Sequence, residues 1–111
     1  MEISFLSRKH AKLANSERDL TRAFGKDMAL KIMARLADLN AATCLDEVSR
    51  VPPARCHELS QDRAGHLAID LKHPHRLIFH PTHKPLPTKA DGGLDWAKVT
   101  AITITDIADY H

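Results

Sequence analysis

The chain ends in three polar residues whose types suit acid–base chemistry: Asp109, Tyr110 and His111. A histidine transfers protons near neutral pH, and a neighbouring carboxylate can orient its imidazole ring. A tyrosine can donate a hydrogen bond and stack on a flat ring. The three residues directly follow a segment rich in β-branched side chains, residues 99–107. We therefore expect them to be ordered at the end of a strand, rather than frayed as chain ends usually are.

Histidine is abundant, with eight in 111 residues. Four of them fall within eleven residues: His73, His75, His80 and His83. No nearby carboxylate or cysteine completes a familiar zinc pattern, and the four flank a proline turn or lie at a strand end and in a loop. We therefore expect no metal and no other cofactor, and interpret these histidines as solvated or packing residues. His10 and His66 carry no signal that separates them from ordinary surface residues.

The charge is mildly basic, with a formal value of +2 and a pI near 8.7. Basic side chains outnumber acidic ones between residues 2 and 31, and they form either a basic face or ordinary solvated helix surfaces. Cys44 and Cys56 form no CxxC pair, which indicates reduced thiols. No signal peptide or membrane span is recognisable, so we expect a cytoplasmic protein.

The first 40 residues predict one short strand followed by helices. Residues 3–5 alternate as in a strand, and Ser7 can cap a helix over Arg8–Ala14. Ser16 begins a capping-box pattern that starts a second helical segment, with Gly25 as its weak point. Residues 26–40 give the clearest periodicity. Its apolar stripe consists of Ala29, Ile32, Leu36 and Leu39, flanked by Met28 and Met33.

The rest of the chain predicts strands. Residues 54–59, 67–71, 76–80 and 99–107 show strand patterns, with a bulge or a departure from the sheet between Ile104 and Ile107. Residues 81–98 hold three prolines and an Asp-Gly-Gly turn, so they predict a long loop in which Trp96 is an anchor. Together these elements predict a single α+β domain over residues 1–111, with two helices packed on one face of a mostly antiparallel sheet.

Several of these segments together resemble the HigB-type toxins of the RelE/ParE superfamily. The segments that carry the resemblance are Arg55-Cys56-His57-Glu58-Leu59, Asp62-Arg63-Ala64-Gly65, Leu67-Ala68-Ile69-Asp70, Arg76-Leu77-Ile78-Phe79 and the terminal Asp109-Tyr110-His111. The resemblance covers nearly the whole chain except residues 81–98, and the terminal Asp-Tyr-His is its most specific part. It implies a compact RelE-like fold and a metal-independent endoribonuclease that cuts messenger RNA on the ribosome.

The resemblance also implies roles for individual residues. In such toxins the ribose 2′-hydroxyl attacks the adjacent phosphate, which requires proton carriers and cations. His57 and His111 are then the proton carriers, with acid and base unassigned, and Asp109 orients His111. Tyr110 stacks on a base or shares in proton transfer. Arg76, Arg63 and Arg55 bind phosphate. From the residues alone, Arg63 and Arg76 could equally pair with Asp62, Asp70 or Asp106. Where many relatives carry a lysine between His57 and Arg63, this chain has Glu58, Ser60, Gln61 and Asp62, which thins the positive charge of the site.

As partners, the resemblance implies an antitoxin with a helix-turn-helix domain, the ribosome and messenger RNA, and no membrane. Two alternatives within toxin–antitoxin systems do not require catalysis. One is a ParE-like gyrase poison, against which the terminal histidine and tyrosine argue. The other is a regulatory protein that only binds, and the chain itself shows no helix-turn-helix pattern.

Overall fold

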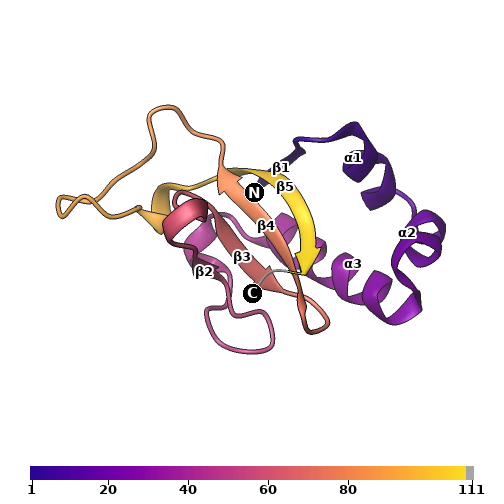
Figure 1. The fold of residues 1–111 in the computed structure, drawn as a ribbon. Helices are drawn as coiled ribbons and strands as arrows, with labels where there is room; N and C mark the ends of the chain where they lie inside the picture. Colours follow the sequence, from indigo (N-terminus) through magenta and orange to yellow (C-terminus); the bar gives the residue numbers. More distant parts are fainter. Residues whose placement is uncertain (110–111) are drawn as a thin grey trace.

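The chain folds into a five-stranded sheet with helices packed on one face (Figure 1). The computed structural model describes residues 1–109. The helices are α1 (Arg8–Ala14), α2 (Glu17–Phe24) and α3 (Lys26–Ala41). The strands are β1 (Glu2–Phe5), β2 (His57–Glu58), β3 (Leu67–Asp70), β4 (His75–Pro81) and β5 (Ala101–Asp109). Three short 3₁₀ turns are η1 (Leu45–Glu47), η2 (Gln61–Arg63) and η3 (Trp96–Lys98).

Both predicted helix caps are present. The Ser7 hydroxyl accepts a hydrogen bond from the His10 backbone N–H at 3.2 Å, and the Ser16 hydroxyl accepts one from Asp19 at 3.1 Å. Where two helices were expected, there are three, because Gly25 ends α2. Its φ of +84° lies in the left-handed region that glycine adopts without strain, and this conformation redirects the chain between α2 and α3.

The predicted stripe of α3 packs against the sheet. Met28, Ala29, Ile32 and Leu39 are buried, and Leu36 packs against them from a half-buried position. The sheet contributes the apolar phase of its strands, namely Leu67, Ile69, Leu77, Phe79, Ile102 and Ile104. Because alternate strand residues point to opposite faces, the polar phase of β3 and β4 lies on the face away from the helices.

The strand order is β1-β5-β4-β3-β2. β1 runs parallel to β5, and all other pairs are antiparallel, which confirms a mostly antiparallel sheet. The register shifts where Ile78 pairs with Asp106 and Phe79 pairs with Ile104, so Thr105 is the extra residue of the bulge predicted between Ile104 and Ile107.

The predicted strand of residues 54–59 differs most from its element. Only His57 and Glu58 form a strand, because Arg55 has a φ of +47° that is incompatible with a continuous strand. The predicted long loop begins after Pro81, which ends β4, and its last three residues form η3. The loop projects from one end of the sheet and contains one isolated bridge between Thr88 and Leu94 (Figure 1). Among residues 1–109, no helix combines the length and the apolar character that a membrane span requires.

Candidate functional site

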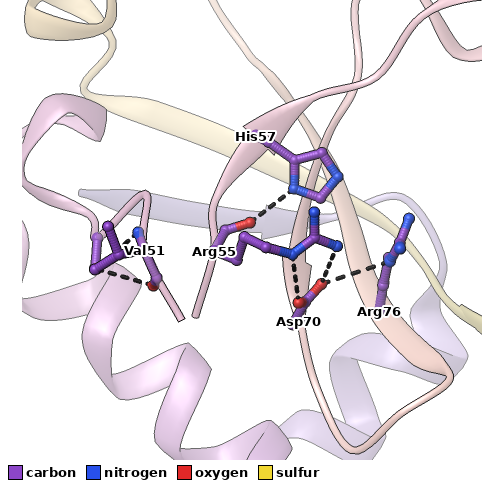
Figure 2. A network of polar contacts seen from close by, with 6 residues as sticks. Val51, Arg55, His57, Asp70 and Arg76 are labelled. Atoms are coloured by element: carbon purple, nitrogen blue, oxygen red, sulfur yellow. Dashed lines mark hydrogen bonds and ion pairs between the residues drawn. The ribbon is translucent and has the colours of Figure 1, made fainter. Parts of the chain in front are cut away.

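Two arginines share one carboxylate at the end of β3. Arg55 donates to Asp70 through Nε at 2.8 Å and through a terminal guanidinium nitrogen at 3.2 Å, and Arg76 Nε lies 3.5 Å from the same carboxylate (Figure 2). The hydrogen bond to Asp70 raises the pKa of the Arg55 guanidinium, so this group stays cationic at any physiological pH. The cluster therefore carries two positive charges against one negative charge. Both guanidinium groups lie where a second anion could approach them.

His57 lies beside this cluster with a defined tautomer. Its Nδ1 is 2.7 Å from the carbonyl oxygen of Arg55 (Figure 2). Because a carbonyl oxygen only accepts hydrogen bonds, Nδ1 must carry the proton, and the neutral ring then has its lone pair on Nε2. A neutral imidazole with an available Nε2 is suited to accept a proton from a hydroxyl group.

Strand register explains how these side chains meet. His57 pairs with Ala68 on β3, and Asp70, two residues further, pairs with Arg76 on β4. Residues two apart on a strand share a face, so His57, Asp70 and Arg76 all lie on the face without helices. The site is partly exposed: the exposed fraction is 39% for the side chain of Arg55, 27% for Asp70 and 25% for Arg76. An open, partly solvated site of this kind suits a macromolecular substrate better than an enclosed small molecule.

The C-terminal residues fall at or beyond the limit of the described chain. The backbone of Asp109 pairs with His75, the neighbour of Arg76, so β5 ends beside the arginine cluster. Tyr110 and His111 lie outside the described residues. The positions predicted for the three terminal side chains therefore stay predictions.

Arg63 is separated from the other predicted phosphate ligands. It lies in η2, just before β3 begins, whereas Asp70 ends β3. Three strand steps from Leu67 to Asp70 span about 10 Å, so Arg63 and the arginine cluster lie toward opposite ends of this strand. The structure thus brings Arg55, Arg76 and His57 together and places Arg63 elsewhere.

The sequence left the partner of Arg76 open among Asp62, Asp70 and Asp106, and the structure shows that it is Asp70. Its alternation with Leu67, Ile69 and Leu71 places Asp70 on the polar face of β3, and this alternation is the sequence feature that indicates its exposure. A pattern within one strand does not say which residue of the next strand lies opposite, so the bridge between Arg55 and Arg76 was not predictable from it.

Trp96 anchors the long loop as predicted. It is 7% exposed, its indole N–H donates to a Glu58 carboxylate oxygen at 3.1 Å, and the Arg50 guanidinium lies 3.7 Å above its ring. Glu58 therefore attaches the loop to the edge strand next to His57. The buried ring is not available for stacking on a base.

The remaining titratable side chains offer no metal centre among residues 1–109: no group of three or more histidine, cysteine, aspartate or glutamate residues there could hold a metal ion. Cys56 is 1% exposed, and burial raises its pKa to about 12, so it is a packing thiol and not a nucleophile.

Comparisons with known proteins show where this fold occurs. No protein-family model and no curated protein matches the chain. Over its full length the chain resembles a chain of the YoeB–YefM complex from Staphylococcus aureus, covering 97% of that chain at 16% identity with a TM-score of 0.54. It also resembles the YoeB/ParE toxin from Agrobacterium tumefaciens, covering 100% of that chain at 11% identity with a TM-score of 0.56. These likenesses confirm the predicted compact α+β fold of a toxin-like domain, although it has three helices, one more than predicted, on a five-stranded mixed sheet.

Proposed function

We propose that this chain is the toxin of a type II toxin–antitoxin system, of the HigB type, and that it cleaves messenger RNA on the ribosome without a metal ion. The observation that carries the proposal is the placement of Arg55, Arg76 and His57 on the open face of a toxin-like fold. Two guanidinium groups beside an imidazole are the groups that metal-free cleavage of RNA requires.

In the proposed reaction the ribose 2′-oxygen attacks the adjacent phosphorus, and the bond from phosphorus to the 5′-oxygen breaks. The products are a 2′,3′-cyclic phosphate and a 5′-hydroxyl. The Nε2 lone pair of His57 supports a role as the base that takes the 2′ proton, and His111 then protonates the leaving 5′-oxygen. Asp109 orients His111, and Tyr110 stacks on a base or shares in proton transfer.

Arg55 and Arg76 bind the phosphate whose charge builds up during the attack. Both already interact with Asp70, so the phosphate competes with this carboxylate for guanidinium N–H groups. Substrate binding therefore includes a partial release of Asp70. Arg63, toward the other end of β3, contacts a more distant part of the RNA.

As partner we propose an antitoxin with a helix-turn-helix domain that keeps the toxin inactive in the cytoplasm. The likeness to a chain of the YoeB–YefM complex supports a partner protein, whereas the helix-turn-helix domain is proposed from the resemblance to HigB-type toxins alone. The ribosome would supply the remaining positioning of the messenger RNA.

The test is to induce the chain alone in bacteria and to map messenger RNA ends, with and without the neighbouring gene. We expect growth arrest and new ends in translated regions, both relieved by the antitoxin. His57→Gln should lower the cleavage rate by about 10²–10⁴-fold, the usual contribution of general acid–base catalysis. The matched control is His73→Gln, which changes an exposed histidine in the β3–β4 turn and should cleave normally. Growth arrest without new RNA ends, accompanied by gyrase-dependent DNA breaks, would establish the ParE-like alternative instead.

A further inference from the structure

A second group of nitrogen-bearing side chains surrounds a hollow of about 320 Å³ at the other end of the sheet, where the long loop leaves β4. Its lining includes His66, His80, His83 and Lys84, and no carboxylate. The proposed cleavage site uses none of these four residues, and His80 and His83 belong to the four clustered histidines that lack a metal-ligand pattern. Their chemistry therefore needs its own explanation.

His66 directly precedes β3, His80 lies in β4, and their rings meet edge to face. Their ring centroids are 5.4 Å apart, at an interplanar angle of 89°. The register of β3 and β4 places them opposite each other, one step beyond the pair of Leu67 and Phe79. Because His80 lies four residues after Arg76 on the same strand, it shares the helix-free face with the arginine cluster, about 13 Å away.

The hydrogen bonds of the rings determine which nitrogens can contact a ligand. His80 Nδ1 donates to the carbonyl oxygen of Pro81 at 2.8 Å, so Nε2 of the neutral ring carries a lone pair and accepts hydrogen bonds. His66 Nδ1 is buried and makes no hydrogen bond within residues 1–109. His83 Nε2 accepts from the Thr100 backbone N–H at 3.0 Å, so its Nδ1 carries a proton and can donate.

Lys84 adds a full positive charge to this set. It is exposed and forms no ion pair within the described residues. A second hollow on the loop is mixed in charge, because its lining includes Asp46, Glu58 and Asp95 as well as Arg50 and Lys89. The hollow beside Lys84 has no carboxylate in its lining and offers the Nδ1–H of His83 next to the ammonium group, so it suits an anion.

We propose that this hollow is a second phosphate subsite, which holds a backbone phosphate of the same RNA some nucleotides away from the cleaved bond. The proposal rests on the proposed function for its ligand, because an RNA strand crossing the helix-free face passes both the arginine cluster and the hollow. The loop of residues 81–98 supplies His83 and Lys84, and it thereby extends the RNA path beyond the sheet.

The test uses the isotopically labelled chain with two probes: a 2′-O-methyl RNA octamer, which cannot be cleaved because its 2′-oxygens are blocked, and inorganic phosphate. We expect the octamer to shift the Cε1–H resonances of His57, His66 and His80. Lys84→Gln should weaken octamer binding about fivefold and reduce the magnitude of the log K against log salt slope by about 0.7, the value for one lost phosphate contact on a single strand. Lys98→Gln removes the same charge from the same loop outside the hollow and should leave both quantities unchanged.

The outcomes separate this proposal from the proposed function. If the octamer shifts the resonance of His57 but not those of His66 and His80, the subsite proposal is wrong and the proposed cleavage site is still supported. The opposite result is also possible: inorganic phosphate or the octamer shifts the resonances of His66 and His80, neither probe shifts that of His57, and no messenger RNA is cut. The anion site would then be supported, and the ribonuclease proposal would fail. If Lys84→Gln and Lys98→Gln weaken octamer binding equally, the subsite proposal is overturned, because the octamer is then attracted by the overall positive charge of the loop and not by a specific site.

Discussion

Asp70→Asn should lower the stability of the protein and at the same time strengthen its binding to RNA. The carboxylate accepts two hydrogen bonds from Arg55 and pairs with Arg76. An asparagine keeps the size of the side chain but loses the negative charge, so the two guanidinium groups lose their counter-charge. They become free to contact a phosphate, and they also repel each other.

The expected loss in the free energy of unfolding follows from the exposure of the three side chains, which ranges from 25% to 39%. A shielded hydrogen bond to a charged group contributes about 1.5–3 kcal/mol, and an exposed ion pair contributes about 0.2–1 kcal/mol. This cluster lies between the two cases, so we expect a loss of about 1–2 kcal/mol. For a domain of this size the melting temperature then falls by roughly 4–8 °C.

Thermal unfolding and titration with the 2′-O-methyl octamer measure the two effects separately. We expect the octamer to bind about two- to fivefold more tightly to the variant, because the competing carboxylate is gone. Asp46→Asn is the matched control, since its ion pair with Arg50 is 55% exposed on both sides and should contribute at most about 0.5 kcal/mol. Weaker octamer binding by a stably folded Asp70→Asn variant would refute the competition and would make Asp70 an orienting residue for the arginines.

Three further predictions concern the tail, the buried thiol and the loop anchor. His111→Gln should keep the fold and the binding of the antitoxin, while the cleavage rate falls by about 10²–10⁴-fold. A lower melting temperature together with lost antitoxin binding would instead give the tail a structural role. Because burial raises the pKa of Cys56 from 9.0 to about 12, this thiol stabilises the fold below about pH 9 and loses that contribution as the pH rises through about 12. At pH 8, peptide mapping after iodoacetamide treatment should find Cys56 modified only in urea, and equal labelling in the folded protein would contradict its burial. Trp96→Phe removes the hydrogen bond to Glu58 and should cost about 1–2 kcal/mol in urea unfolding, whereas Glu58→Gln, which keeps an acceptor, should cost less.

Local patterns in the sequence were sufficient for most of the architecture. The caps at Ser7 and Ser16 depend on residues three apart, and the stripe of α3 depends on a period of 3.6 residues. Alternation placed Leu67, Ile69, Leu77 and Phe79 on the core face, and the change of phase after Ile104 gave the bulge. Each of these features is specified within a short segment. The same patterns predicted a β2 that is too long, because the alternation of side chains does not indicate a positive φ at Arg55.

The arrangement of the candidate site depended on contacts between segments far apart in the chain. From the sequence, His57, Arg55 and Arg76 were predicted as site residues through the resemblance to HigB-type toxins. Their arrangement required the folded chain, because it is there that Asp70 joins the two arginines, that Arg63 lies toward the other end of β3, and that His66 meets His80. The physical reason is strand register, which is fixed by the packing of the whole sheet on α3. A shift of one residue between β3 and β4 would separate these pairs while leaving every local pattern unchanged.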